Sequence, residues 1–363
     1  MKKHSFIISG GGTGGHIYPA IAIADALKEK YPNADFMFVG ASDRMEMQKI
    51  PNAGYEIKGL WISGLQRGQL IKNLLLPFKL ISSLWGAYKV IKKQKPIVAI
   101  GTGGYASAAL LKMAGWVGVP TVVQEQNSFP GITNKLLAND AAKICVAYEG
   151  LERFFPKEKV LITGNPVRKD ILNEQVTSVE ALGYFSLKTD RKTVLVLGGS
   201  LGAKLINELI ASRLNYFDEL GVQVLWQCGQ LYFESYKGLA TNSVEIRAYL
   251  DRMDLAFAAA DVIVSRAGAG SVSELAIVGK PVLFIPSPNV AEDHQTKNAE
   301  AIVNKGAAFM IKESELEVKF DAQIAQLLND EELSGEVAKK IKKLAKPNAT
   351  EAIVAEIIKI IEE

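Results

Sequence analysis

The sequence predicts an α/β protein made of two Rossmann-like domains, each with a parallel sheet covered by helices. Short apolar runs alternate with helix-length segments along the chain, which is the pattern of parallel sheets. Four apolar runs lead into a glycine-rich turn that opens a helix, two in each half. At 363 residues the chain exceeds the roughly 250–300 residues at which one core stops growing. We therefore expect two domains that face each other across a cleft.

The predicted strands follow from apolar runs bounded by turn residues, and amphipathic spacing separates them. In the first half we expect strands at Ser5–Ser9, Ala34–Val39, Ile97–Ile100, Thr121–Gln124 and Ile144–Ala147. In the second half we expect them at Thr193–Leu197, Val222–Trp226, Val262–Ser265 and Val282–Ile285. Between them lie helical patterns such as Ala20–Lys30.

The crossing between the domains is expected within Glu149–Arg168, because Asn165-Pro166 disfavours a continuing helix. Residues 1–168 then form the first domain and 169–344 the second. We expect a final helix at 345–363 to pack back onto the first domain, with one apolar face formed by Ile353, Ile357 and Ile361. The charged stretch Glu313–Lys346 is expected to form only a solvated helical face.

Composition is that of an ordered soluble protein. Hydrophobic residues make up 48% of the chain and charged residues 22%, which excludes a disordered chain. The net charge of +3 is too small to indicate nucleic-acid binding. The two cysteines, Cys145 and Cys228, lie in apolar stretches without metal-ligand spacing, which suits a reducing compartment. The apolar run after Met1 is too short for a signal peptide, so we expect a cytoplasmic location.

Glycine-rich turns at the start of a helix form anion-binding sites. Glycine lets the backbone approach a ligand closely, and the free N–H groups of the first helical turn favour phosphate. The four turns of this chain are Gly10–His16, Gly101–Tyr105, Gly198–Ala203 and Ala267–Ser271. We expect them to bind negatively charged groups in both domains.

The first turn also satisfies a dinucleotide fingerprint, with Gly10, Gly12 and Gly15 spaced as G-x-G-x-x-G. That fingerprint needs an acidic residue at the end of the second strand, but this strand ends in Phe38-Val39-Gly40 and Asp43 follows only later. Nicotinamide binding and a turn with only a packing role remain alternatives here. No turn carries the Gly-Lys-Ser/Thr ending of a P-loop.

Six motifs in one order carry a specific resemblance. They are Gly11–His16, Gly101–Tyr105, Glu125–Asn127, Gly164–Arg168, Gly198–Ala203 and Asp293–Ala299. Over nearly its whole length the chain resembles the bacterial cell-wall transferases of glycosyltransferase family 28, which add N-acetylglucosamine to lipid I to form lipid II. The resemblance implies a GT-B fold, UDP-N-acetylglucosamine as donor substrate, lipid I as acceptor, and inversion at the anomeric carbon. It implies no cofactor and no required metal.

The resemblance also implies a set of donor-binding residues, most of them in the second half. They are Thr13, Gly14, Gly15, Asn127, Arg168, Gly199, Ser200, Leu250, Ala269, Gly270, Glu274, His294 and Gln295. Backbone amides around Ser200 would stabilise the leaving diphosphate, although a serine there is also a good helix N-cap. Arg168 would contact the nucleotide, and a structural ion pair is its alternative.

Three further donor contacts have a chemical reason and a structural alternative. The Glu274 carboxylate suits the two ribose hydroxyls, but a glutamate in a first helical turn is also stabilised by the helix dipole. His294 and Gln295 would read the sugar hydroxyls directionally, or simply lie exposed in a loop. The backbone of Leu250 would read the uracil edge, and its side chain would otherwise belong to the core.

The first domain is expected to bind the acceptor through Thr13, His16, Tyr105, Glu125 and Asn127. The acceptor 4-hydroxyl must lose a proton as it attacks the donor carbon. His16, one of three histidines, titrates in the useful range. It could instead bind a phosphate or pack its own turn, and Glu125 is a rival base.

A lipid-linked acceptor requires access to a membrane surface. The expected patch comprises Lys72, Leu75, Phe78, Trp85 and Trp116, in which apolar and aromatic groups lie beside lysines. A stripe buried in its own domain is the alternative. The resemblance implies an anionic membrane surface, lipid I and other cell-wall synthesis and division proteins as partners, without nucleic acid, at the cytoplasmic face of the plasma membrane.

Two other classes of protein remain open at this point. A nicotinamide-dependent oxidoreductase would bind NAD or NADP through the first domain. A membrane-associated binding subunit would recruit a separate catalyst and have no turnover of its own. Donor-type and acceptor-type turns in one chain argue against that subunit.

Overall fold

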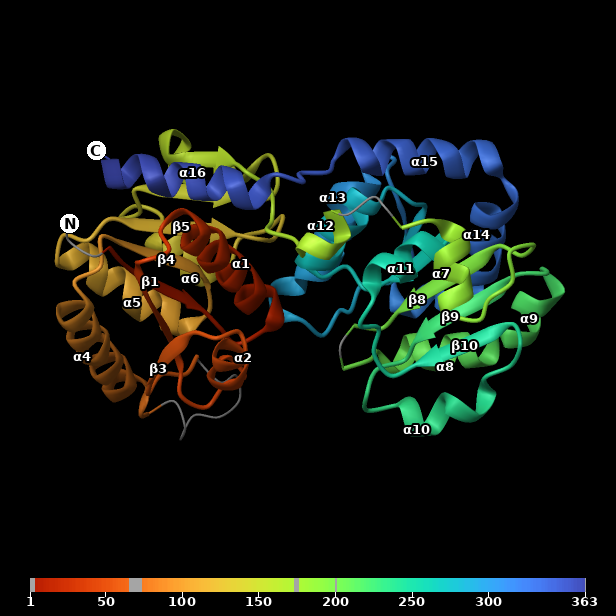
Figure 1. Ribbon diagram of the computed structural model, residues 1–363, viewed down its shortest axis with the longest axis horizontal. Coiled ribbons are helices and arrows are strands. Elements are labelled where there is room, and N and C mark those ends of the chain that lie inside the picture. Colours follow the sequence, from red (N-terminus) through yellow and green to blue (C-terminus); the bar gives the residue numbers. More distant parts are fainter. Residues whose placement is uncertain (1–3, 65–73, 173–175, 200, 363) are drawn as a thin grey trace. The chain divides into compact units, whose positions relative to one another are not determined.

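The computed structural model describes residues 4–64, 74–172, 176–199 and 201–362, and it divides into two compact units (Figure 1). The first unit contains Met1–Val167 and Asn348–Glu363, and the second contains Arg168–Pro347. The sequence placed these divisions at residues 168 and 344, within a few residues of the observed ones.

The first unit is built on a seven-stranded parallel sheet of order β3-β2-β1-β4-β5-β6-β7. Its strands are β1 (Ser5–Gly10), β2 (Asp35–Ala41), β3 (Glu56–Leu60), β4 (Val98–Gly103), β5 (Thr121–Glu125), β6 (Lys143–Val146) and β7 (Val160–Ile162). Its helices are α1 (Gly14–Lys30), α2 (Glu46–Asn52), α4 (Leu76–Gln94), α5 (Tyr105–Trp116), α6 (Ile132–Leu137) and α16 (Ala349–Glu362).

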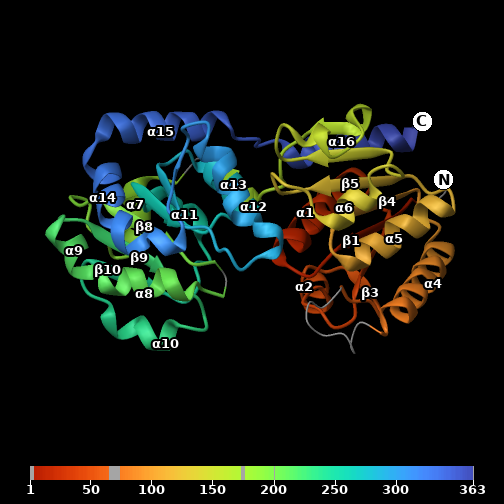
Figure 2. The same cartoon turned by 180° about the vertical axis from the view of Figure 1, so that it is seen from behind.

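Alternating side chains of this sheet form two cores. Phe6 and Ile8 of β1 are buried on one face together with apolar residues of α1 and α16, whereas Ile7 is buried on the other face with residues of α4 and α5. The final helix α16 packs beside α1, and Ile353 and Ile357 are fully buried (Figures 1 and 2). The expectation that the last helix completes the first domain is therefore met by its packing.

The second unit has a six-stranded parallel sheet of order β10-β9-β8-β11-β12-β13. Its strands are β8 (Thr193–Leu197), β9 (Gln223–Gln227), β10 (Val244–Arg247), β11 (Val262–Ser265), β12 (Val282–Phe284) and β13 (Phe309–Met310). Its helices are α7 (Ser178–Tyr184), α8 (Lys204–Ser212), α9 (Leu214–Glu219), α10 (Phe233–Tyr236), α11 (Met253–Ala259), α12 (Ala269–Val278), α13 (His294–Val303), α14 (Leu316–Asn329) and α15 (Glu331–Lys343).

All nine predicted strands coincide with observed ones to within a few residues. The strands β3, β7, β10 and β13 were not predicted. All four lie at a sheet edge. Charged residues interrupt the apolar pattern of β3 and β10, and β7 and β13 are only three and two residues long.

The prediction for Glu313–Lys346 was wrong. Four apolar residues of α14 are buried in the second core at helical spacing: Leu316, Phe320, Ile324 and Leu327. Val337 and Ile341 of α15 are also buried. The stretch is a packed part of the second unit, and its many charges lie on the outer faces of these helices.

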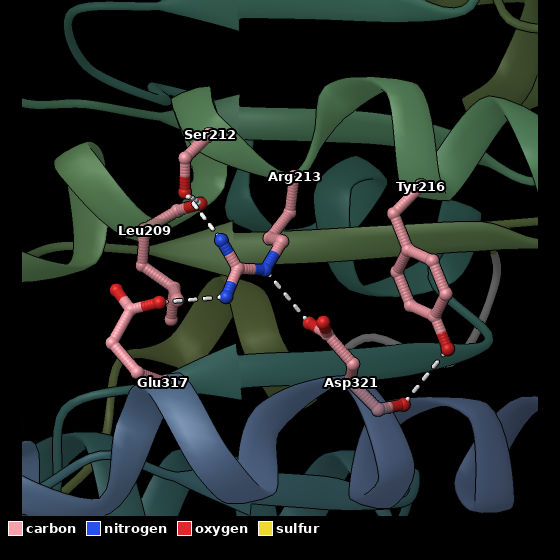
Figure 3. Close-up of polar contacts among 6 residues, drawn as sticks. All are labelled: Leu209, Ser212, Arg213, Tyr216, Glu317 and Asp321. Atoms are coloured by element: carbon pink, nitrogen blue, oxygen red, sulfur yellow. Dashed lines mark hydrogen bonds and ion pairs between the residues drawn. The ribbon is translucent and has the colours of Figure 1, made fainter.

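Arg213 ties α14 to the segment between α8 and α9 (Figure 3). Its guanidinium donates to Asp321 at 2.9 Å and to Glu317 at 2.8 Å. The Tyr216 hydroxyl donates to the backbone carbonyl of Asp321 at 3.0 Å. Hydrogen bonds that the guanidinium donates to Glu317 and Asp321 raise the pKa of Arg213 above its ordinary value, so this cation stays charged.

In the described part of the chain, no helix is both apolar enough and long enough to cross a bilayer.

Candidate functional site

The first glycine turn joins β1 to α1 and lies against the end of β4. The N–H of Gly11 donates to the carbonyl of Gly103 at 3.2 Å. Gly12 has a φ of 84°, in the left-handed region that glycine favours. The turn ends at Thr13, which precedes the first residue of α1 and has extended backbone geometry. The expected residues Thr13, Gly14 and Gly15 therefore lie at a helix N-terminus.

His16 lies in the first turn of α1 and is held on two sides. Its Nδ1 is 2.8 Å from the carbonyl oxygen of Gly11. A carbonyl oxygen can only accept, so Nδ1 carries the proton and Nε2 of the neutral ring carries the lone pair. The hydroxyl of Thr102 donates to the carbonyl of His16 at 2.7 Å. The half-buried imidazole is thus oriented to accept a proton at Nε2.

Glu46, at the start of α2, is a residue that the sequence analysis missed. It is 1% exposed, and its carboxylate accepts from the N–H groups of Gly12 at 2.9 Å and Ala41 at 3.0 Å. The dinucleotide fingerprint requires an acidic residue at the end of the second strand, whereas Glu46 lies five residues past the end of β2. Its carboxylate bonds the protein's own turn.

Glu125 is 1% exposed at the end of β5, and it organises the loop that follows. One carboxylate oxygen accepts from the backbone N–H of Asn127 at 3.0 Å and from its side-chain amide at 3.1 Å. The other accepts from the N–H of Gly131 at 3.1 Å and from Asn134 Nδ2 at 2.8 Å. These four hydrogen bonds place Glu125 and Asn127 together and commit the carboxylate to the loop.

Buried amide side chains beneath this loop were also missed. Gln124 Nε2 donates to Asn165 Oδ1 at 2.9 Å, and Asn165 Nδ2 donates to the carbonyl of Gln126 at 3.0 Å. Gln126 Nε2 donates to the carbonyl of Thr102 at 2.7 Å. A chain of hydrogen bonds therefore links Asn165, through Gln126, to the end of β4 near His16.

Tyr105 is the first residue of α5 and is 49% exposed. It follows Gly103 and Gly104, which both have positive φ. The structure thus brings His16 and the start of α5 to neighbouring strand ends, because β1 and β4 are adjacent in the sheet. Glu125 and Asn127 lie at the end of the next strand, β5.

The second unit carries the turn Gly198–Ala203 between β8 and α8. Ser200 lies outside the described residues. Gly199 and Gly202 have φ of 80° and 84°, and the N–H of Gly202 donates to the carbonyl of Gly199 at 2.9 Å. A Cβ on Gly202 would lie 2.1 Å from the carbonyl oxygen of Cys228, so no other residue fits there.

Neutral side chains support this second turn. Gln227 Nε2 donates to the carbonyl of Gly199 at 2.9 Å. Asn207 Nδ2 donates to the carbonyl of Cys228 at 2.8 Å, and Trp226 Nε1 donates to Asn207 Oδ1 at 3.0 Å. The sequence offered no signal for these contacts beyond polar residues in an apolar run.

The fourth turn leads into α12, whose first residues are Ala269 and Gly270. Glu274 lies in the second turn of this helix and accepts from Arg168 Nε at 3.2 Å. The structural ion pair considered for Arg168 is therefore present. Their side chains are 37% exposed for Arg168 and 19% for Glu274.

The segment after β11 is further held by Arg266, which the sequence analysis also missed. Arg266 forms an ion pair with Glu313 at 2.6 Å, and these side chains are 13% and 12% exposed. Its guanidinium also donates to the carbonyl of Ile285 at 2.9 Å. This nearly buried pair fixes the strand end from which the Ala267–Ser271 turn begins.

His294 and Gln295 open α13 and are partly buried. Gln295 Oε1 accepts from the N–H of Ser287 at 2.9 Å, so its side chain orders the loop after β12. Leu250 is 3% exposed, which places its side chain in the core. A role for its backbone stays a prediction.

The cysteines are buried structural residues. Burial raises the pKa of Cys145 to about 12 and also raises the pKa of Cys228. Both thiols are therefore protonated at neutral pH and are poor nucleophiles.

The expected membrane patch lies mainly on α4. Leu75, Phe78, Trp85 and Trp116 are 48%, 66%, 57% and 63% exposed, so the alternative of a buried stripe does not hold for them. Lys72 lies outside the described residues. Three lysines lie over exposed tryptophans: Lys79 over Trp61, Lys89 over Trp85 and Lys112 over Trp116.

Comparison with known proteins assigns both halves of the chain. The description "Glycosyltransferase family 28 N-terminal domain" matches residues 6–146, and "Glycosyltransferase family 28 C-terminal domain" matches residues 193–353. The chain belongs to glycosyltransferase family 28. The expected Rossmann-like pair of parallel-sheet domains of the GT-B class is confirmed, and the protein is a glycosyltransferase.

Curated proteins similar to this chain over nearly its whole length carry the name UDP-N-acetylglucosamine--N-acetylmuramyl-(pentapeptide) pyrophosphoryl-undecaprenol N-acetylglucosamine transferase. The protein from Flavobacterium psychrophilum is 58% identical over 363 residues, covering 100% of this chain and 99% of that protein. The one from Christiangramia forsetii is 59% identical over 355 residues, covering 98% and 97%. The crystal structure of Acinetobacter baumannii MurG matches with a TM-score of 0.79 at 27% identity, covering 99% of this chain and 100% of that one.

Proposed function

We propose that this glycosyltransferase moves N-acetylglucosamine from UDP-N-acetylglucosamine to the N-acetylmuramyl residue of lipid I, forming lipid II. Similarity over the whole chain to transferases of that name supports the substrates. The geometric observation that carries the chemistry is the orientation of His16, whose Nδ1 bonds the Gly11 carbonyl and whose Nε2 carries the lone pair.

The reaction is a single inverting displacement. The 4-hydroxyl oxygen of the acceptor attacks the anomeric carbon of the donor, and the bond from that carbon to UDP breaks. The hydroxyl proton passes to Nε2 of His16, which acts as general base and releases it to solvent after turnover. UDP leaves with the bonding electron pair, which adds negative charge to its diphosphate.

His16 fits the base role better than Glu125. The Glu125 carboxylate is 1% exposed and accepts four hydrogen bonds from its own loop. Protonating it would break that set, and its lone pairs are already used. We therefore assign Glu125 to holding Asn127, and Asn127 and Tyr105 to binding the acceptor sugar.

The leaving diphosphate is assigned to the second unit. The Gly198–Ala203 turn precedes α8, so the free N–H groups and positive dipole end of a helix favour an anion there. Fixed dipoles of this kind stabilise developing charge without a metal ion. We place Gly199, Ser200, Ala269 and Gly270 at the diphosphate.

The rest of the donor is assigned to groups of the same unit. We place Glu274 at the ribose hydroxyls, with Arg168 beside it, and His294 and Gln295 at the sugar. The backbone of Leu250 reads the uracil edge. The ion pair of Arg168 with Glu274 is compatible with this role, because a carboxylate has lone pairs to accept from both a guanidinium and a diol.

Membrane association is assigned to the exposed face of α4. Phe78, Ile81 and Trp85 are each more than half exposed, and they follow helical spacing beside Lys79 and Lys89. Apolar groups insert into the lipid interface while lysines contact anionic headgroups. We therefore propose that the protein works at the cytoplasmic surface of the plasma membrane, where its proposed acceptor would lie.

The test is release of UDP from UDP-N-acetylglucosamine by the purified chain. We expect release only when a lipid I analogue is present, with a disaccharide product of β-1,4 linkage. Folded protein that binds both substrates without turnover would favour the binding-subunit alternative and contradict the proposal. A thermal shift with NAD or NADP would favour the oxidoreductase, against which the bond from Gly12 to Glu46 already argues.

A further inference from the structure

One peptide group of the first turn is bonded to a side chain at each end. The carbonyl of Gly11 accepts from His16 Nδ1 at 2.8 Å. The N–H of Gly12, which belongs to the same peptide group, donates to Glu46 Oε2 at 2.9 Å. Glu46 and His16 are thus connected through a single planar amide.

The turn is shaped to admit this carboxylate. A Cβ on Gly11 would lie 2.2 Å from Glu46 Oε1, and a Cβ on Gly40 would lie 2.6 Å from Glu46 Cγ. Glu46 Oε1 accepts from the N–H of Ala41 at 3.0 Å, whereas Oε2 accepts from Gly12. Two glycines from separate segments therefore leave room for one side chain, which is 1% exposed.

Within the described residues, no cation forms an ion pair with Glu46. Its negative charge is instead stabilised by two backbone N–H groups, which are charge-assisted hydrogen bonds. Each oxygen accepts from a different N–H group, and a glutamine of similar size would offer only one acceptor oxygen. A carboxylate therefore suits this position, and its charge lies one peptide group away from His16.

Hydrogen bonds in a chain polarise one another. A carboxylate that accepts from the N–H of an amide pushes the π electron density of that amide toward its carbonyl oxygen, so the Gly11 oxygen becomes a stronger acceptor. A stronger acceptor holds the proton on His16 Nδ1 more firmly. It also stabilises the positive charge that the ring acquires when Nε2 takes a proton.

We propose that Glu46 is a positioning residue for His16, acting through the Gly11–Gly12 peptide to keep the ring proton on Nδ1 and the lone pair on Nε2. The inference deepens the proposed function, and its kinetic consequence rests on that function. The predicted position of the ring proton does not rest on that function.

The experiment is ¹⁵N NMR of the full chain labelled in histidine, since ring-nitrogen shifts report which nitrogen carries the proton. The chain has three histidines, and the variant H16N assigns the His16 signals. We expect the neutral ring of His16 to be in the Nδ1–H form in the wild type. Finding the Nε2–H form there would overturn the proposal, whatever the variants do.

The variant Glu46→Gln removes the charge at nearly constant volume and leaves one acceptor oxygen for the two N–H donors. We expect it to move the His16 proton population toward Nε2 while binding of UDP-N-acetylglucosamine to the second unit is unchanged. The matched control is Asp43→Asn, which removes the same charge from an exposed site three residues away, where Asp43 pairs with Arg44 at 3.8 Å. An equal shift in the control, or none in E46Q, would overturn the proposal.

Kinetics give the consequence for turnover. We expect E46Q to lower kcat by roughly tenfold to hundredfold, the range seen for carboxylate partners of metal-binding histidines, with KM for the donor unchanged. E46D keeps the charge and should recover part of both kcat and the Nδ1–H population. If the ring proton behaves as expected but no variant or wild type transfers sugar, the proposed function fails and the positioning role stands.

Discussion

Two glycine turns of this protein have similar sequences and different supports. The Gly10–His16 turn of the first unit is held by a buried carboxylate, Glu46. The Gly198–Ala203 turn of the second unit is held by neutral amides, among them Gln227. The N–H of Gly12 already donates to an internal anion, whereas these supports of the second turn carry no charge.

The comparison leads us to assign the two turns different roles. In the first unit the glycines make room for a carboxylate and a histidine, and the proposed proton transfer is assigned to that arrangement. In the second unit Gly202 lets two backbone segments pack at close range, and the proposed diphosphate site is assigned to the start of α8. Under the proposed function, similar local sequences thus serve the two halves of one reaction.

Removing the imidazole should have the largest effect. For His16→Ala we expect kcat to fall by roughly hundredfold to ten-thousandfold, as for loss of a general base, with little change in KM for the donor. UDP release under saturating substrates measures it. His4→Ala is the matched control, because His4 packs on Tyr31 in the same unit. If H16A keeps kcat within a few-fold of the wild type, the first turn has no role in proton transfer.

The second prediction contrasts the two kinds of buried carboxylate. Glu313 depends on a cation, Arg266, whereas Glu46 depends on backbone N–H groups. Arg266→Met leaves Glu313 unpaired at 12% exposure, and we expect the free energy of unfolding of the second unit to fall by about 3 kcal/mol. Urea denaturation followed by a probe in that unit measures the loss. An unchanged midpoint would show that Glu313 is not dependent on its partner.

The third prediction concerns a carboxylate placed at the second turn, where the first turn has Glu46. Gln227 is 5% exposed and bonds the Gly199 carbonyl, so Gln227→Glu introduces a carboxylate at that turn. We expect KM for UDP-N-acetylglucosamine to rise about tenfold, which corresponds to roughly 1.4 kcal/mol of repulsion between the carboxylate and the diphosphate. Gln227→Met, which removes the hydrogen bond without adding charge, should have a smaller effect. Equal effects of the two variants would rule out charge as the cause.

The smallest effect is expected for an arginine whose carboxylate partners are exposed. Arg213 pairs with Glu317 and Asp321, whose side chains are 79% and 44% exposed (Figure 3). Arg213→Met should therefore lower the free energy of unfolding by about 1 kcal/mol or less. Thermal unfolding of R213M, measured side by side with that of R266M, checks this prediction, because both variants replace an arginine of the second unit by methionine. A loss as large as that of R266M would show that the exposure of the carboxylate partners does not separate the two arginines.

The glycine turns and strands could be predicted from the sequence because their signals are local. The side chains that support these turns could not be predicted in this way. Glu46 bonds a residue 34 positions away, and it does so only because β1 and β2 are neighbours in the sheet. The acidic residue of the dinucleotide fingerprint was sought at the end of the second strand, and Glu46 lies beyond it, on a helix.

Burial was the second property that the sequence did not reveal. Glu125 was a candidate base by residue type, and only the structure shows that its carboxylate is used by four donors of its own loop. In α14, Phe320 and Ile324 follow helical spacing but lie among charged residues, so the segment read as solvated. Arg266 and Glu313 are 47 positions apart and meet only in the folded unit.

The most direct test of the difference between the two turns is a crystal structure of the protein with UDP-N-acetylglucosamine. We predict that the diphosphate lies on backbone N–H groups of the Gly198–Ala203 turn and the start of α8, while the N–H of Gly12 keeps its bond to Glu46. A diphosphate bound to Gly12, with the Glu46 carboxylate displaced, would contradict the account.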